Sequence, residues 1–255
     1  MTHIFIFILG LATGISINYL ADVLPVKRRL AAPSCLSCGI EQKPLNYFIW
    51  PRRCDTCGKR RSLRTWAVEF VFSVAALWLW NSPSESLGFF VGLVVLSFLG
   101  LVAIIDLEHR LILHPVSLVG AALGLVIGIW FNGIRDTLLG GLFGFAIMLA
   151  LYYFGAFLMG WLARRRGQVL EEDALGFGDV ILSGVIGLLL GWPGIVVGLI
   201  LTILIAGIVS FLYLILKMIT RKYRFDMAVP YGPFLISAAI LLLYFRGFIL
   251  QYLGW

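Results

Sequence analysis

Two aspartates, Asp106 and Asp179, stand at the ends of separate apolar segments of this chain. Uncompensated charge is costly in hydrocarbon, so an ionisable residue at the end of an apolar span is a candidate functional group. Two carboxylates held a few ångströms apart share a proton, so one can act as a base toward water and the other as an acid toward a carbonyl. We therefore interpret the pair as a catalytic dyad for peptide hydrolysis.

Asp179 ends the sequence Gly176-Phe177-Gly178-Asp179. The two glycines let the backbone take unusual dihedral angles and let another backbone, such as an extended peptide, approach closely. An aspartate at a helix N-terminus can also be a simple cap that the helix dipole favours. That alternative suits Asp106 less well, because it lies at the other end of its helix, where the dipole opposes a negative charge.

Other polar groups near the dyad are candidates for supporting roles. Glu69 lies one turn inside an apolar segment, where it either reaches the interface, pairs with a basic residue of 59–64, or contributes to binding. Glu171, Glu172 and Asp173 form an acidic run before the glycine motif that is either a solvated loop or a means of steering a basic substrate by long-range attraction. His109 and His114 are more typical of interfacial residues.

All four cysteines lie in one loop, as two C-x-x-C pairs with 15 residues between them: Cys35, Cys38, Cys54 and Cys57. Such pairs can close a tetrahedral four-thiolate Zn²⁺ site, and a site filled by four protein ligands is structural. Two disulfides or a thiol redox motif are the alternatives, and a reducing compartment disfavours the disulfides. The loop has few large apolar residues, so metal binding would supply its folding energy.

The composition predicts that these groups are carried by a membrane protein. Hydrophobic residues make up 61% of the 255 residues and charged residues only 13%, far from a soluble domain. Because a helical span needs about 20 apolar residues, we expect an all-α polytopic protein with eight transmembrane helices and a small zinc-ribbon-like loop domain. The expected spans are 4–22, 65–81, 86–107, 113–131, 137–162, 179–191, 195–216 and 230–252.

The distribution of basic residues predicts the orientation. With these spans, 18 of the 20 Lys and Arg fall on one side of the membrane, which the positive-inside rule identifies as cytoplasmic. The cysteine loop and both aspartates are on that side. The net charge of +7 is therefore a topology signal and not a sign of nucleic-acid binding, although basic loops also favour the anionic lipids of the bilayer.

Taken together, the motifs resemble the prepilin peptidases, also called type IV leader peptidases, which are membrane aspartic proteases of the GxGD class. The resemblance covers nearly the whole chain. It is carried by the four-cysteine loop, Ile105-Asp106-Leu107-Glu108-His109-Arg110, Gly176-Phe177-Gly178-Asp179 and Pro230-Tyr231-Gly232-Pro233-Phe234-Leu235. Presenilin-like proteases share the Gly-x-Gly-Asp motif, but the cysteine loop and the proline-glycine motif favour the prepilin enzymes.

The resemblance implies cleavage of the short basic leader of a type IV prepilin or pseudopilin on the cytoplasmic side of a bacterial inner membrane, with Asp106 and Asp179 as the catalytic pair. Many relatives also methylate the new N-terminus with S-adenosylmethionine. The candidate substrate-binding or supporting residues are Gly176, Gly178, Glu69, Glu171, Glu172, Asp173, Pro230, Gly232 and Pro233.

We expect a first transmembrane helix over 1–24, a zinc-binding cytoplasmic domain over 25–64 and a transmembrane peptidase domain over 65–255. The alternative function is a cation or proton transporter that uses the membrane carboxylates, with the zinc loop as a docking module. Transport would produce a gradient-dependent flux in vesicles, whereas proteolysis would produce a shortened substrate.

Overall fold

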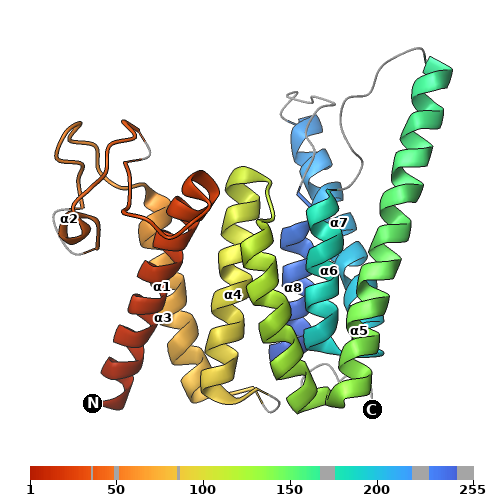
Figure 1. The fold of residues 1–255 in the computed structure, drawn as a ribbon, viewed down its shortest axis with the longest axis horizontal. Coiled ribbons are helices and arrows are strands. Elements are labelled where there is room, and N and C mark those ends of the chain that lie inside the picture. Colours follow the sequence, from red (N-terminus) through yellow and green to blue (C-terminus); the bar gives the residue numbers. More distant parts are fainter. Residues whose placement is uncertain (36, 49–51, 85–86, 167–175, 220–229, 246–255) are drawn as a thin grey trace. The chain divides into compact units, whose positions relative to one another are not determined.

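Helices dominate the part of the chain that the computed structural model describes, which is residues 1–35, 37–48, 52–84, 87–166, 176–219 and 230–245 (Figure 1). They are α1 (Thr2–Lys27), α2 (Pro44–Phe48), α3 (Leu63–Asn81), α4 (Gly88–His109), α5 (His114–Arg166), α6 (Phe177–Leu190), α7 (Gly194–Ile219) and α8 (Gly232–Tyr244). Among these residues the only β-type pairings are two isolated antiparallel bridges in the cysteine loop.

Five helices, α1, α3, α4, α5 and α7, are long and apolar enough to cross a membrane, and α6 and α8 are shorter apolar helices. The long α5 is interrupted at Gly133, whose φ of 79° and ψ of 164° are not helical, and the chain doubles back there (Figure 1). It therefore accounts for both expected spans 113–131 and 137–162. The predicted all-α, multi-pass fold class is confirmed.

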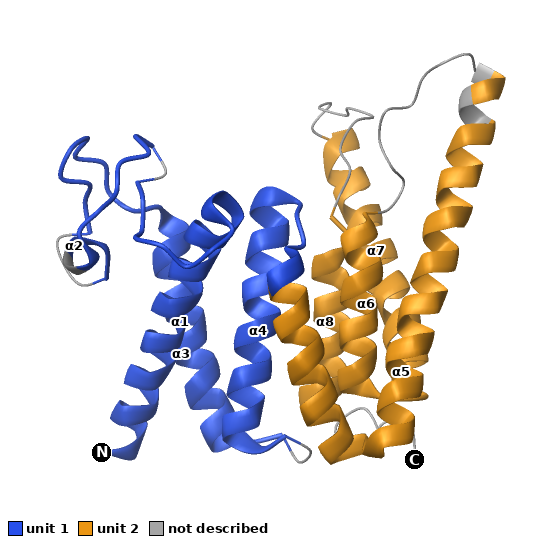
Figure 2. Ribbon diagram, viewed as in Figure 1, with its two compact units in different colours: residues 1–115 blue, residues 116–255 orange. Residues whose placement is uncertain are grey.

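The chain forms two compact units, Met1–Pro115 and Val116–Trp255 (Figure 2). Asp106 belongs to the first unit and Asp179 to the second. The expected division into 1–24, 25–64 and 65–255 follows sequence features and not packing, and it stays a prediction.

In the first unit, α1 packs against α3 through close backbone contact. A Cβ atom on Gly14 would lie 2.7 Å from the Cα of Glu69, and one on Gly10 would lie 2.7 Å from the Cα of Ser73. One turn nearer the cysteine loop, the amide of Asn18 donates to the carbonyl of Thr65 across 3.0 Å. Small residues that let helix backbones approach are typical of packing in membranes, and here they place Glu69 directly beside α1.

In the second unit, α6 packs against α5 in the same manner. A Cβ atom on Gly140 would lie 2.3 Å from the carbonyl oxygen of Gly187, and one on Gly144 would lie 2.6 Å from that of Ser183. The Ser183 hydroxyl donates to the Gly144 carbonyl across 2.9 Å. These contacts fix the position of α6, the helix that carries Asp179.

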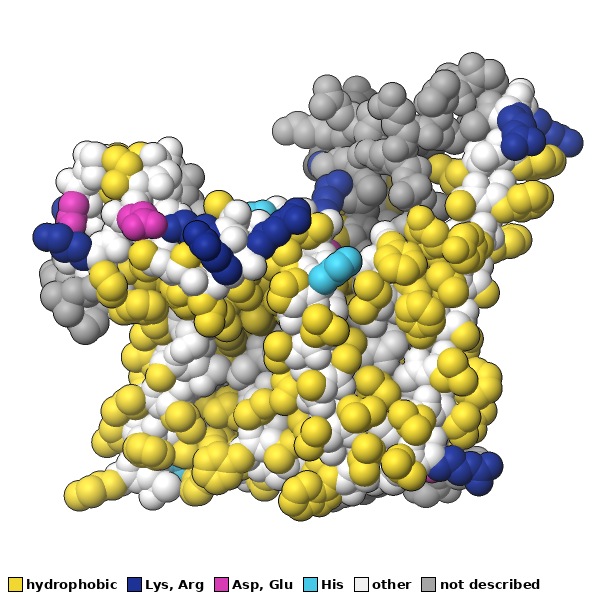
Figure 3. Space-filling model, viewed as in Figure 1, with side chains coloured by type: hydrophobic (Ala, Val, Ile, Leu, Met, Phe, Trp, Pro, Cys, Tyr) yellow, Lys and Arg dark blue, Asp and Glu magenta, His cyan; other side chains and the backbone are white. Residues whose placement is uncertain are grey.

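The outer surface agrees with a lipid environment. Large apolar side chains of α7, including Ile203, Leu204 and Phe211, are more than half exposed. In the first unit, Lys and Arg side chains gather at the cysteine-loop end of the helices, above a largely hydrophobic surface (Figure 3). This arrangement is the one expected where spans end at a membrane interface.

Candidate functional site: two carboxylates and a four-cysteine module

Asp106 lies in the last turn of α4, which ends at His109. Its backbone carbonyl accepts from the N–H of Arg110 across 2.8 Å, and Arg110 closes the helix with a left-handed φ of 50°. The side chain is only 5% exposed, and its Oδ2 atom is buried with no hydrogen-bond partner among the described residues. A buried carboxylate oxygen without a partner is costly in a purely structural role, so Asp106 fits a site that receives a ligand.

Asp179 lies in the first turn of α6, three residues after the N-cap Gly176. Its backbone N–H donates to the Gly176 carbonyl across 3.1 Å, and its side chain is 8% exposed. Because α6 presents the positive end of its dipole here, the carboxylate is stabilised, whereas the end of α4 opposes a charge on Asp106. The two aspartates therefore occupy electrostatically opposite helix ends, as the sequence predicted.

The glycines of the Gly-Phe-Gly-Asp motif are not explained by unusual backbone angles. Gly176 has a φ of −73° and a ψ of 137°, which any residue adopts, and Gly178 lies inside α6. Neither is among the described residues with positive φ. A Cβ atom on Gly176 would lie 3.4 Å from Oδ2 of Asp179. The prediction that these glycines take unusual dihedral angles was therefore wrong, and Gly176 instead leaves space beside the Asp179 carboxylate.

The proline-glycine motif lies beside Asp179 in the second unit. Tyr231 is the N-cap of α8, Gly232 begins the helix and Pro233 stands in its first turn. Pro230 and Pro233 are half-buried, and Gly232 is buried. Tyr231 is close enough to Asp179 to interact with its charge. From the sequence, Tyr231 was identified only as part of the proline-glycine motif, and its proximity to the Asp179 carboxylate was not predicted.

Glu69 is buried and paired. Its carboxylate accepts from Arg52 across 2.8 Å, with side chains 5% and 10% exposed. Of the three alternatives for Glu69, the structure shows pairing with a basic residue. The partner is not among residues 59–64, because the loop brings back the more distant Arg52, held with a left-handed φ of 55°. Glu171, Glu172 and Asp173 lie outside the described residues, and the exposed His109 and His114 fit the interfacial interpretation.

The four cysteines converge as predicted. Their sulfur atoms all lie within 4.8 Å of one another, with Cys35 and Cys57 3.7 Å apart and Cys38 and Cys54 3.6 Å apart. Zn–S bonds of about 2.3 Å in a tetrahedron require sulfur atoms about 3.8 Å apart, so the donor set fits Zn²⁺. All four are free thiols.

Two matching turns form this module. In the first, Gly39 has a φ of 72° and donates its N–H to the Cys35 carbonyl across 2.8 Å. In the second, Gly58 has a φ of 68° and donates to the Cys54 carbonyl across 2.9 Å. Backbone N–H groups of Cys57 and Thr56 lower the pKa of Cys54 to about 6, which favours the thiolate form that binds metal.

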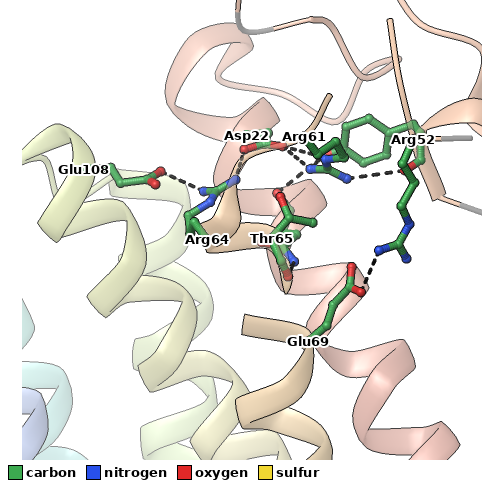
Figure 4. Close-up of polar contacts among 9 residues, drawn as sticks. Asp22, Arg52, Arg61, Arg64, Thr65, Glu69 and Glu108 are labelled. Carbon is green, nitrogen blue, oxygen red and sulfur yellow. Dashed lines mark hydrogen bonds and ion pairs between the residues drawn. The ribbon is translucent and has the colours of Figure 1, made fainter. Parts of the chain in front are cut away.

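A polar network that the sequence did not predict joins this loop to the helices (Figure 4). Asp22, 5% exposed near the end of α1, accepts from Arg61 at 2.6 Å and also from Arg64. Arg64 in turn donates to Glu108 on α4 across 2.7 Å. Arg61 stacks over the ring of Tyr47, whose hydroxyl donates to Asp22 across 2.6 Å. The network fixes the loop against α1, α3 and α4.

Comparison with known proteins identifies relatives over most of this chain. Residues 93–215 match the model of the type IV leader peptidase family, a stretch that contains both aspartates. A prepilin leader peptidase/N-methyltransferase of Myxococcus xanthus is 28% identical over 83% of this chain and 63% of its own length. The proteins of that name from Pseudomonas putida and Pectobacterium carotovorum are 27% and 25% identical, over 82% and 94% of this chain and 70% and 92% of theirs. No solved structure matches the chain.

Proposed function

We propose that this chain, whose residues 93–215 match the type IV leader peptidase family, is a membrane aspartic endopeptidase that removes the basic leader of a prepilin or pseudopilin. The matched part of the chain spans slightly less than two thirds of the Myxococcus xanthus relative, so activity and substrate are inferences from the site. The bacterial relatives and the multi-pass fold support an inner-membrane location.

The observation that carries the proposal is the carboxylate of Asp106. It is buried within α4, and its Oδ2 has no partner among the described residues. It also falls, together with Asp179, within the stretch that matches the peptidase family. A buried carboxylate oxygen without a hydrogen-bond partner supports a catalytic role for Asp106 more than a structural one.

In the proposed mechanism, the two aspartates meet over the scissile peptide bond with a water between them. The ionised carboxylate takes a proton from the water, which attacks the carbonyl carbon, and the protonated carboxyl group donates its proton to the carbonyl oxygen. The tetrahedral intermediate then collapses: the leaving amine takes the proton of the carboxyl group that holds it, and the other carboxylate regains a proton from a hydroxyl of the intermediate, which restores the dyad. The opposite helix ends favour the ionised form on Asp179 and the protonated form on Asp106.

The space beside Gly176 supports the entry of an extended peptide, since a Cβ atom there would face the Asp179 carboxylate. Supporting roles for Gly178, Glu69, Pro230, Gly232 and Pro233, and for the acidic run 171–173, stay part of the proposal. The excess of Lys and Arg on the side of the cysteine loop supports cleavage on the cytoplasmic side.

We also propose that Cys35, Cys38, Cys54 and Cys57 hold a structural Zn²⁺. A zinc ion bound by four thiolates would cross-link the loop and would have no open coordination position. These residues would therefore stabilise the loop and not act on the substrate. Methylation of the new N-terminus with S-adenosylmethionine is a second proposed activity, supported by the names of the relatives.

The test is to incubate the purified chain in lipid nanodiscs with a prepilin and S-adenosylmethionine and to weigh the products by mass spectrometry. Cleavage should give the mature pilin and the free leader, and methylation should add about 14 Da to the mature product. Asp106→Asn is the inactive control. An intact substrate with the wild-type chain, together with a gradient-dependent ion flux in vesicles, would favour the transporter alternative.

A further inference from the structure

A pocket of about 270 Å³ lies between the four-cysteine module and the ends of α1 and α3. Its lining includes Asp22 and Thr65, which are buried, and Arg52, Arg61 and Arg64, which are partly buried. Lys59 and Arg60 also line it and are exposed, and we call these two residues its rim. All of these residues belong to the first unit. Cys35 and Cys54, two of the proposed zinc ligands, also line the pocket, so it borders the zinc site, whereas the proposed cleavage does not use it.

The charges of the pocket favour an anion. Five of the charged side chains that line it are basic, and Asp22 is the single acidic one. Both Asp22 oxygens are occupied, Oδ1 by Arg64 and Oδ2 by Arg61 and the Tyr47 hydroxyl. A cation would therefore find no free carboxylate among the described lining residues. Arg52, Arg61 and Arg64 each pair with a carboxylate of Glu69, Asp22 or Glu108, so Lys59 and Arg60 are the basic groups of the described lining that an anion would find outside an ion pair.

Two buried donors in the lining also lack partners. Thr65 is 1% exposed, yet its Oγ1 has no hydrogen-bond partner among the described residues, and the same is true of Nε of Arg52. The backbone of Thr65 is fully used, since its carbonyl accepts from Asn18 and its N–H donates to Ser62. Buried polar groups are rarely left unpaired unless a ligand or water satisfies them.

The position of the pocket indicates where the anion comes from. Asp22 and Thr65 are the last and first residues of the predicted spans 4–22 and 65–81, so the pocket opens at the depth where the hydrocarbon ends and lipid head groups begin. Basic pockets at this level between membrane helices bind the head groups of anionic lipids. Arginine and lysine match phosphate oxygens in charge and in hydrogen bonding.

We propose that this pocket binds the phosphate of an anionic phospholipid, with Thr65, Arg52, Lys59 and Arg60 as its donors. The bound lipid would join the four-cysteine module to the bilayer by satisfying groups that the protein leaves unpaired. The inference does not depend on the proposed cleavage, because it uses no residue of the aspartate pair.

The test is to titrate phosphatidylglycerol into the full-length, delipidated chain in a neutral detergent, where no charged bilayer surface exists. Binding is counted by native mass spectrometry and by the shift in melting temperature, with phosphatidylcholine as the neutral lipid and inorganic phosphate as the free anion. Wild type should retain one phosphatidylglycerol per chain and should be stabilised by it, but not by phosphatidylcholine.

Thr65→Val is the decisive variant, because valine keeps the shape of threonine and removes only the hydroxyl. Without lipid it should be at least as stable as wild type, since the hydroxyl it removes is buried and unpaired. With lipid it should bind phosphatidylglycerol about tenfold more weakly, through loss of a hydrogen bond to a charged group. A variant that was merely damaged would instead be less stable in both conditions.

The rim is tested by Lys59→Gln with Arg60→Gln, which should weaken binding at least about tenfold. The matched control is Arg28→Gln with Arg29→Gln, which removes the same charge from exposed residues of the same unit outside the pocket. Equal weakening by both pairs, unchanged binding by Thr65→Val, or stabilisation by inorganic phosphate alone would each overturn the proposal. Displacement of the lipid by S-adenosylmethionine would assign the pocket to the methyl donor instead.

Discussion

Arg64 on α3 donates to Glu108 on α4 across 2.7 Å, and Glu108 stands two residues beyond Asp106. The other end of the same guanidinium contacts Asp22 on α1. One side chain thus links the ends of three helices of the first unit (Figure 4). One of these ends, that of α4, carries the candidate catalytic Asp106. The carboxylate of Asp22 is also held by Arg61, which lies in the loop between the cysteine module and α3.

The first prediction concerns the dyad. Asp106→Asn and Asp179→Asn should each lower cleavage of a prepilin by at least about 100-fold, because an amide keeps the shape of the side chain but cannot exchange the proton. The product is measured by mass spectrometry on protein purified in equal yield. Glu108→Gln, which neutralises a more exposed carboxylate close by, should keep most of the activity. Substantial cleavage by either aspartate variant would remove that residue from the mechanism.

The second prediction concerns Arg64. Arg64→Gln should lower the free energy of unfolding by about 2 kcal/mol, because it removes hydrogen bonds to charged partners, one of them buried. Glu108→Gln should cost less, about 0.5 kcal/mol, because its side chain is 38% exposed and solvent weakens the pair. Thermal unfolding in detergent measures both, and the exposed Arg29→Gln serves as the control for charge. Equal effects of the Arg64 and Arg29 variants would show that the link between the helices does not stabilise the unit.

The third prediction concerns helix packing in the second unit. Gly140→Ala should destabilise the protein by about 1–3 kcal/mol, since the added Cβ would lie 2.3 Å from a backbone oxygen that cannot move aside. Gly160→Ala in the same helix is the matched control, because no described atom lies within 4 Å of its added Cβ. The melting temperatures of the two variants are compared directly. If both are as stable as wild type, the close contact of α5 with α6 does not determine stability.

The fourth prediction concerns the metal. Elemental analysis of protein purified under reducing conditions should find one zinc ion per chain, and replacing Cys35 and Cys54 together by serine should abolish it. Because the folding of such a loop depends on its metal, the zinc-free loop should become sensitive to limited proteolysis while the membrane helices stay protected. Zinc absent from the wild-type protein at neutral pH would contradict the four-thiolate site.

Local spacing accounts for what the sequence predicted well. The helices follow from apolar segments of the right length, and the thiol cluster follows from two C-x-x-C pairs, each closed by a glycine turn. Pairings between distant residues could not be predicted, because they depend on the path of the loop. Arg52 reaches Glu69 only after the loop folds back. Asp22 is near the end of a predicted span, and nothing in the sequence indicated that it would be buried and paired with two arginines.

The two candidate catalytic aspartates show the same limit. The sequence predicted that each aspartate stands at a helix end, and the structure describes the surroundings of each aspartate within its own unit. Their approach to one another stays a prediction, which the paired asparagine variants test through activity. Tyr231 was missed because its proximity to Asp179 depends on how α8 packs beside α6, and one tyrosine at a helix start carries no signal in a single sequence.

The contacts between α1 and α3 recur every four residues, at Gly10 with Ser73, Gly14 with Glu69 and Asn18 with Thr65. Such a seam constrains which changes in chain length the protein can accept. One residue inserted between Gly14 and Asn18 would rotate the rest of α1 by about 100° and turn Asn18 and Asp22 away from their partners. An insertion of four residues would return Asn18 and Asp22 to nearly the same face of α1, but it would shift Asp22 by about 6 Å along the helix axis. Homologous chains with the same network should therefore vary in length in their loops and never within this stretch of α1.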